Sequence, residues 1–412
     1  MSNNDLIVSL DIGTSKVRVI IGEISNGAIN IIGVGSADSE GIRKGAIVDI
    51  DQTVQSIRNA VDHAERMVGI TIDEVYVGIA GNHIALQTNH GVVAVSGEDR
   101  EITQEDIDRV LQAARVVALP PEREIINLVP KQFFVDGLGD IQDPRGMIGV
   151  RLEVECTVIT GTKAAIHNLI RCVEKAGLKI AGIILMPLAT GMMALSKDEK
   201  QMGAVLADIG AGATTLAVFE GGSLVAVSTL PIGGDYVTSD ICYGLKTQTE
   251  HAEKIKLKYG CARIEDAAED VTFKVVRVGT NTEKEFNQVD LANIIEPRMQ
   301  EIFQLIRQEV KRLGYLDKIN GYVLTGGTVS MPGVLPLAQM ELESSVRIAV
   351  PDYIGVRDPS YSSGVGIIQY VTKYMRTRGS SVSKRPARTA SASGSSRTGI
   401  KEWFKNLFKE FI

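Results

Sequence analysis

Two short stretches combine an aspartate with small residues, a pattern suited to holding phosphate and a hydrated metal ion. One reads DIGAGATT and begins at Asp208, directly after an apolar run. Gly210 and Gly212 allow backbone angles that a side chain forbids, and let main-chain N–H groups approach an anion. A carboxylate at a strand end can position a hydrated divalent cation beside phosphate oxygens. By itself the stretch is equally compatible with a hairpin turn that binds no ligand.

The same pattern occurs 197 residues earlier, as DIGTSK beginning at Asp11. Aligning Asp11 with Asp208 also aligns Gly13 with Gly210, and a second polar turn follows each copy. Two copies of strand, turn and strand indicate two similar lobes that face one anion. No GxxxxGK[ST] loop occurs, so the site is not of the Walker type. The sequence therefore predicts a duplicated α/β fold with a nucleotide in its cleft.

Three later stretches offer further ligand contacts. Gly-Gly-Asp at 233–235 precedes a helix predicted over 237–243, and Glu253 and Lys256 share a helical face. Gly326 and Gly327 follow an apolar strand and precede a turn and a helix, so the loop can lie flat against a base or phosphate. The alternatives are an ordinary intrahelical ion pair and a tight strand-to-helix turn.

Composition restricts the class of protein. A chain of 412 residues suits two or more domains, and 44% apolar with 5% aromatic residues is typical of a soluble α/β protein. The four cysteines form no CxxC pair, which favours reduced thiols in a cytoplasmic protein over disulfides or a zinc site. We expect no signal peptide and no membrane-spanning segment.

The net charge of −6 conceals an asymmetry. From Lys373 onward the chain holds ten basic and two acidic residues, a net charge of +8, so the remainder carries −14. An acidic body argues against nucleic-acid binding and directs attention to the basic tail.

The rest of the chain predicts two long helices and a small inserted module. A helix is predicted over Ile50–Val68, with one apolar face made of Val54, Ile57, Ala60, Val61 and Ala64. Residues 82–157 then read as a small β-α-β-β insertion, with strands at 91–95, 124–129, 132–135 and 151–158 and a helix capped by Thr103 and Asp106. Structural elaboration and partner binding are both open roles for this insertion. A later amphipathic helix is predicted over 300–313.

The tail has two parts. Residues 376–398 contain six basic residues and no acidic one among many Ser, Gly and Ala, which predicts a flexible basic linker. Residues 399–412 predict a short amphipathic helix with an apolar face on one side and lysines on the other, which suits a membrane interface. The alternative is a helix that docks on the body. The apolar positions of this segment follow helical spacing: Ile400, Trp403, Phe404, Leu407, Phe408, Phe411 and Ile412.

Taken in order, DIGTSK, the Pro187 helix, DIGAGATT, GGD, AEKIK and LTGGT resemble the actin, Hsp70 and sugar-kinase ATPase superfamily over residues 5–372. The insertion, the IEPR run at 295–298 and the terminal helix are similar to the FtsA family of bacterial cell-division actins. This resemblance implies subdomains 1A (1–81, 158–202 and 359–375), 1C (82–157), 2A (203–232 and 291–358) and 2B (233–290).

The resemblance also implies ATP and Mg as ligands. Asp11 and Asp208 would hold the metal through water. The residues that would border the nucleotide are Asp11, Gly13, Thr14, Ser15, Lys16, Asp208, Gly210, Gly212, Thr214, Gly234, Glu253, Lys256, Gly326 and Gly327.

The partners implied by the family are the C-terminal tail of the tubulin-like FtsZ, further copies of the chain in filaments, anionic membrane lipids and later division proteins. Glu296, Arg298 and Glu301 fall where such proteins receive the FtsZ tail. The implied location is the cytoplasmic face of the membrane at the division site.

One position departs from related ATPases. Hsp70 and the bacterial actin MreB have a glutamate before the proline of the connecting helix, where this chain has Met186 before Pro187. A thioether cannot take a proton, which predicts at most a slow ATPase in which ATP acts as an assembly ligand. The alternative is a small-molecule kinase of the same superfamily. An Hsp70-like chaperone is excluded, because only about 40 residues follow the ATPase region and a peptide-binding domain is larger.

Overall fold

The computed structural model describes residues 6–25, 27–279 and 283–374. The predicted linker at 376–398 and the predicted helix at 399–412 lie outside these residues. The described residues divide into two compact units, one formed by residues 6–85 with Thr162–Gln369, the other by Leu86–Gly161 with residues 370–374. The first unit contains two lobes, each built around one five-stranded sheet.

The first lobe has the strand order β11-β6-β1-β2-β3. Strands β1, β2 and β3 form an antiparallel meander. Strand β6 pairs in parallel with β1, and β11 pairs in parallel with β6. The strands are β1 (Leu6–Ile12), β2 (Lys16–Ser25), β3 (Ala28–Asp38), β6 (Glu74–Ile79) and β11 (Lys179–Leu185).

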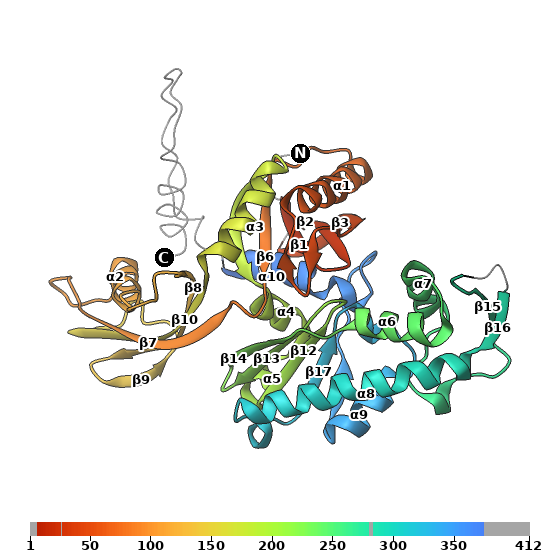
Figure 1. The fold of residues 1–412 in the computed structure, drawn as a ribbon. Coiled ribbons are helices and arrows are strands. Elements are labelled where there is room, and N and C mark those ends of the chain that lie inside the picture. The colour runs from red at the N-terminus through yellow and green to blue at the C-terminus, as the bar shows by residue number, and fades with distance from the viewer. Residues whose placement is uncertain (1–5, 26, 280–282, 375–412) are drawn as a thin grey trace. The chain divides into compact units, whose positions relative to one another are not determined.

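The second lobe repeats this arrangement as β14-β13-β12-β17-β18. Three antiparallel strands are again followed by two parallel ones, so the predicted duplication is confirmed (Figure 1). The strands are β12 (Ala204–Ile209), β13 (Thr214–Glu220), β14 (Ser223–Leu230), β17 (Tyr322–Thr325) and β18 (Val346–Ile348).

Helix α1 (Ile50–Val68) has the predicted bounds and buries the predicted apolar face. The Asp49 side chain accepts a hydrogen bond from the Gln52 N–H at its start, and Gly69 ends it in the left-handed conformation with φ 74°. The other elements of this lobe are β4 (Ile42–Arg43), β5 (Ala46–Ile47), α3 (Lys163–Lys175) and α10 (Ser362–Tyr374). Three further elements contact the second lobe: α4 (Met186–Ala194) packs on β11, β12 and β13, α5 (Lys197–Met202) packs on β13, and the 3-10 turn η5 (Pro359–Tyr361) packs on η4 (Gly327–Ser330).

Helix α8 (Gln288–Arg312) is longer than predicted, because it continues through Pro297. Its start is fixed by a capping box between Asn287 and Asp290, and its apolar side belongs to the second-lobe core. The remaining elements of the lobe are α6 (Gly234–Leu245), α7 (Thr249–Tyr259), η2 (Ile264–Asp266), β15 (Thr272–Val276), β16 (Glu283–Asn287), η3 (Leu316–Lys318), η4 (Gly327–Ser330) and α9 (Val334–Leu342).

The inserted unit is a four-stranded sheet, β7-β10-β8-β9, with α2 (Gln104–Ala114) packed on one face. Thr103 and Asp106 form the predicted capping box. Two details differ from the sequence reading: one strand runs through Pro130 where two were expected, and β9 was not predicted. Pro130 lacks an N–H to donate but is extended, so it does not end the strand. The strands are β7 (Ala85–Ala94), β8 (Arg123–Val135), β9 (Leu138–Ile141) and β10 (Arg151–Thr162).

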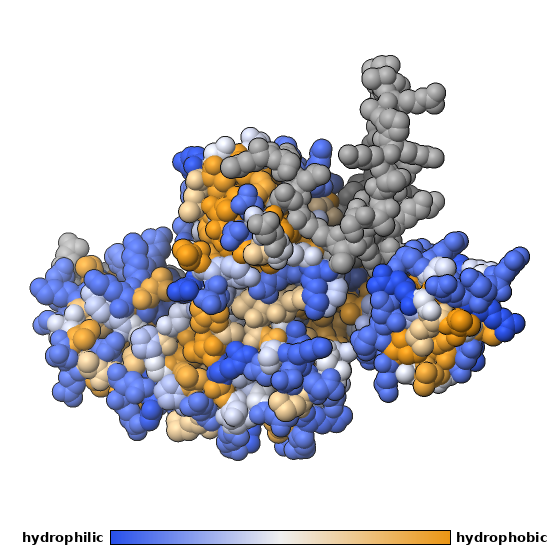
Figure 2. Space-filling view, turned by 180° about the vertical axis from the view of Figure 1, so that it is seen from behind, coloured by the Kyte–Doolittle hydropathy of each residue, from blue (hydrophilic) through white to orange (hydrophobic). Residues whose placement is uncertain are grey.

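Apolar side chains also reach the surface of the molecule, as the orange areas in Figure 2 show. On the inserted unit, the large exposed apolar side chains are Val92, Val116, Leu138, Ile148 and Val150. Within the described part of the chain, no helix is both long and apolar enough to cross a membrane.

Candidate functional site

A cavity of about 730 Å³ lies between the two lobes of the first unit. Both aspartate turns contribute to its wall, together with α7 and the loop after β17. Twelve of the predicted nucleotide-site residues line it: Asp11, Gly13, Thr14, Ser15, Lys16, Asp208, Gly210, Gly212, Glu253, Lys256, Gly326 and Gly327.

The two turns have the same backbone geometry. In the first, the Gly13 N–H donates to the Lys16 carbonyl at 3.1 Å, and in the second the Gly210 N–H donates to Ala213 at 3.0 Å. The tips of the turns meet across the cleft. A Cβ on Gly212 would lie 2.7 Å from the Thr14 side chain, so this position admits only glycine without a shift.

The cavity places two carboxylates in a confined space. Burial raises the pKa of Asp11 to about 6, with Arg18 opposing the shift and the Asp208 charge adding to it. Burial also raises the pKa of Asp208, against a hydrogen bond from Ser363 and the charge of Arg18. A buried carboxylate, Asp11, and a half-buried one, Asp208, beside glycine turns fit a dication, which would balance their charge.

No cluster of three or more metal-ligating side chains occurs in the described ranges. A metal held here would therefore need water and phosphate oxygens to complete its coordination, as the sequence predicted for Asp11 and Asp208.

Sequence reasoning missed Arg18. It lies directly opposite Asp11 in the β1–β2 pairing, stacks over the Tyr361 ring at 5.3 Å, and lines the cavity. Its Nε is buried and has no hydrogen-bond partner among the residues described. An anion in the cavity would supply that partner. The register of a short hairpin could have revealed this residue, because it places the seventh residue after Asp11 across from it.

Glu253 and Lys256 form the ion pair that helical spacing allowed, at 2.6 Å. The pair is also part of a wider polar cluster, since Lys256 donates to the Gly234 carbonyl at 3.1 Å and to Thr238 Oγ1 at 2.8 Å. Lys256 is only 9% exposed. The pair is therefore an ordinary intrahelical ion pair and also part of the cavity wall.

Two predicted site residues do not line the cavity. Thr214 is fully buried and donates to the Ile232 carbonyl at 2.8 Å. Gly234 supports the second turn from behind, with its N–H donating to Gly210 at 2.9 Å. Lys16 lines the cavity but pairs with Asp38 at 2.5 Å.

The Gly326–Gly327 loop forms part of the cavity wall beside Asp208. Gly326 has φ 94°, and a Cβ there would lie 2.4 Å from Asp208 Oδ1, so the loop packs directly on that carboxylate. A Cβ on Gly327 would meet only Ser360, at 3.6 Å. Met186 also lines the cavity, packed against Gly78.

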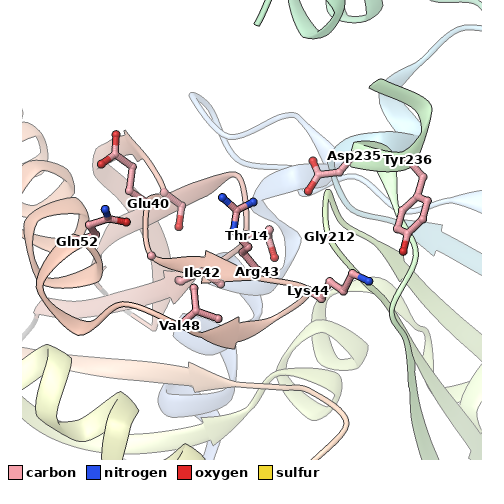
Figure 3. Close-up of a pocket in the computed structure, with 12 residues that line it drawn as sticks. Thr14, Glu40, Ile42, Arg43, Lys44, Val48, Gln52, Gly212, Asp235 and Tyr236 are labelled. Atoms are coloured by element: carbon pink, nitrogen blue, oxygen red, sulfur yellow. The ribbon is translucent and has the colours of Figure 1, made fainter. Parts of the chain in front are cut away.

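A second cavity, of about 550 Å³, shares Thr14 and Gly212 with the first (Figure 3). It lies between the β4–β5 hairpin of the first lobe and the start of α6 in the second. Lys44 on the hairpin points toward Tyr236 on α6, with its Nζ 5.7 Å from the ring centre (Figure 3). The Gly45 N–H donates to Thr14 Oγ1 at 3.2 Å, which ties the hairpin to the first turn.

The predicted partner-binding residues lie on α8. Arg298 makes two hydrogen bonds to Asp240, at 2.5 and 3.1 Å, pairs with Glu301, and also stacks over Tyr236 at 5.7 Å. Glu296 accepts a hydrogen bond from the Ile264 N–H at 2.5 Å. The structure brings the three residues together on one stretch of helix, although Arg298 is engaged within the lobe.

Comparison with known proteins agrees with this architecture. A family model described as cell division protein FtsA matches residues 205–366, and one described as an SHS2 domain inserted in FtsA matches residues 81–160. Cell division protein FtsA of Bacillus subtilis is 53% identical over 379 residues, covering 92% of this chain and 86% of that protein. The chain belongs to the FtsA family of cell-division proteins.

Solved structures of low sequence identity share the fold. The PilM–PilN type IV pilus biogenesis complex aligns with a TM-score of 0.63 at 16% identity, over 89% of this chain and 98% of that one. MreB5 of Spiroplasma citri bound to ADP aligns with a TM-score of 0.55 at 12% identity, over 92% and 99%. The chain is thus an actin-like cell-division protein, with the family's insertion at the predicted place.

Proposed function

We propose that this protein binds ATP with Mg between its lobes, associates with itself, and tethers FtsZ filaments to the cytoplasmic face of the membrane at the division site. The observation that carries the nucleotide part is the pair of matching turns that places Asp11 and Asp208 in one cavity. MreB5, which has the same fold, was solved with ADP.

In this proposal different residues bind the phosphates, the metal and the adenosine. Gly13 and Gly210 leave room for phosphate oxygens, Arg18 neutralises phosphate charge, and the two carboxylates hold water molecules that bind the metal. The metal itself would screen the phosphate charges. The Gly326–Gly327 loop would lie against the adenosine.

The nucleotide site is tested with Asp208→Ala and Gly327→Asp in the full chain. The first removes a metal carboxylate and the second places a charged side chain in the cavity. Both should lower affinity for a fluorescent ATP analogue at least about 100-fold, since each removes or opposes a buried charged contact. Asp317→Ala, on the exposed η3 turn, is the control. Unchanged affinity in both variants would contradict the site.

Met186 supports slow turnover, because no carboxylate occupies its position beside the cavity. ATP would then act by favouring one lobe arrangement in which copies associate. A turnover near the median enzyme value of about 10 s⁻¹ would exclude this role.

Membrane attachment is assigned to residues 399–412, which lie outside the described residues. A 14-residue helix is about 21 Å long, too short to span a bilayer but long enough to lie in its interface. Many helices on an assembled row would bind together at high effective concentration. Trp403→Glu should abolish co-sedimentation with anionic liposomes while ATP binding persists, whereas Trp403→Phe should sediment normally. Loss of ATP binding in Trp403→Glu would favour a helix docked on the body.

The FtsZ tail is assigned to the surface of α8 around Glu296, Arg298 and Glu301. Arg298→Glu should weaken binding of an FtsZ C-terminal peptide. Arg307→Glu is the matched control, because Arg307 lies on the same helix but pairs with Glu343. Equal weakening in the two variants would argue against this location. The exposed apolar side chains of the inserted unit are the candidate contact for later division proteins (Figure 2).

A further inference from the structure

Two helices carry the chain between the lobes. Helix α4 follows β11 of the first lobe and precedes β12 of the second, and α10 follows β18 of the second lobe and returns to the first. They cross in direct contact, because a Cβ on Gly366 of α10 would lie 2.2 Å from the Ala189 carbonyl of α4. On the first-lobe side, α10 packs on β2, where Gly364 faces Ile20. Any change in lobe angle must act on this crossing.

A chain of hydrogen bonds runs from the crossing to the cavity. Ser363 Oγ on α10 lies 3.1 Å from Asp208 Oδ2, and Thr190 Oγ1 on α4 lies 3.0 Å from Ser363 Oγ. A carboxylate only accepts, so Ser363 must donate its single hydroxyl hydrogen to Asp208, and Thr190 must then donate to Ser363. Thr190 is 2% exposed and Ser363 is 4% exposed, so the bond between them is buried, whereas the bond to Asp208 lies at the cavity wall.

The Asp208 carboxylate is thereby fixed on both sides. Ser363 holds Oδ2, while Oδ1 packs against the Gly326 backbone. We propose that Ser363 is a positioning residue for the metal carboxylate Asp208, and that the Thr190–Ser363–Asp208 chain links the orientation of that carboxylate to the α4–α10 crossing. This inference rests on the proposed binding of ATP with Mg.

The neighbouring residue provides a matched control. Ser362 is equally buried, at 1% exposed, but its Oγ accepts from Thr325 Oγ1 at 2.7 Å and does not contact Asp208. Ser362→Ala and Ser363→Ala thus remove the same atoms from adjacent positions of one helix. Thr190→Val tests the outer bond, because it keeps the shape of the side chain and removes only the donor.

The experiment measures affinity of the full chain for a fluorescent ATP analogue, once with millimolar Mg and once with EDTA. Ser363→Ala should lower the affinity in Mg about tenfold or more, as removal of a group that orients a metal ligand does, and leave the EDTA value within about twofold. Thr190→Val should show the same Mg-specific loss at a smaller size, about threefold. Ser362→Ala should not change the ratio of the two affinities.

Other outcomes overturn the inference. A Ser363→Ala loss that is equal in Mg and in EDTA, or no loss at all, would make Ser363 a packing residue only. If Ser363→Ala does not fold, as judged by its melting curve, an unchanged Mg-to-EDTA ratio in Thr190→Val overturns the proposal and a lowered ratio supports it. A wild-type chain that shows no Mg-dependent binding overturns the proposed function and this inference with it.

Discussion

The two aspartate turns share a backbone and differ in their chemistry. Each pairs its strands in the same register, so that the residue opposite Asp11 is Arg18 and the residue opposite Asp208 is Thr215. The equivalent position therefore holds a cation in one lobe and a hydroxyl in the other.

The residues inside the turns differ in the same way. The first turn reads Thr-Ser-Lys after its glycine, where the second reads Ala-Gly-Ala. The partner of Asp11 lies on the adjacent strand, whereas the partner of Asp208, Ser363, is 155 residues away. The duplicated backbone thus repeats the same turn in each lobe, but the first hairpin carries the charged Lys16 and Arg18 where the second carries only small or hydroxyl-bearing residues.

Among the differences between the two turns, the largest effect is expected from removing the Arg18 cation. Arg18→Gln should weaken ATP binding about 10- to 100-fold, because a charge-assisted contact to phosphate is worth about 1.5–3 kcal/mol. Thr215→Val, at the equivalent position, should change affinity no more than about twofold. Titration of both variants with a fluorescent nucleotide tests the asymmetry, and similar losses in the two would remove it.

The next effect concerns space. Gly212→Ala should weaken nucleotide binding about tenfold, because the added methyl overpacks against Thr14, 2.7 Å away. Adding Thr14→Ala should restore most of the loss, since it removes the two nearest atoms. Affinities of the two single variants and the double variant form the test. A double variant as weak as the product of the single effects would show that the two turn tips do not compete for space.

A third prediction concerns pH and the ligand-free protein. The Asp11 pKa rises from 3.8 to about 6 on folding, so folding favours its protonated form. The stability from this group is present below pH 3.8 and is lost as pH rises through about 6. Asp11→Asn should therefore raise the melting temperature by a few degrees at pH 7.5 and by less at pH 5. A pH-independent difference would contradict the raised pKa.

The smallest effect should come from the β4–β5 hairpin, which is hydrogen-bonded to Thr14 of the first turn. Lys44→Gln and Tyr236→Leu should each weaken nucleotide binding about two- to fivefold, the size of a cation–π contact of about 0.5–1 kcal/mol. Tyr236→Phe keeps the ring and should bind normally. In the double variant the effects should not add. Full additivity would mean that the two side chains do not act through each other.

The sequence predicted what depends on local pattern. Repeated strand, turn and strand segments revealed the duplication, and the spacing of the apolar residues from Val54 to Ala64 predicted α1. The helix predicted over 300–313 was too short, since α8 begins at Gln288 and continues through Pro297, which cannot donate a helical hydrogen bond. There the buried Ile295 and Met299 on either side continue one apolar face, and tertiary packing outweighs the lost hydrogen bond.

The candidate site was predicted less completely than the fold. Glycines and aspartates carry their signal in type and spacing, whereas Arg18 required the hairpin register and Ser363 required the packing of a distant helix. Thr214 matched a motif but turned its hydroxyl to Ile232. Whether a side chain lines a cavity depends on contacts that one sequence does not encode locally.

The order of the elements along the chain also sets the order in which they can fold. The second-lobe sheet is contained within residues 204–348, so it can form as soon as that stretch leaves the ribosome. The first-lobe sheet begins with the earliest residues, but a face of it is covered by α10, where Ile368 packs against Gly22. That sheet must wait, partly uncovered, until nearly the whole chain has been made. During synthesis the nascent first lobe therefore presents apolar surface for the longest time, and it is the part of the molecule that we expect chaperones to bind.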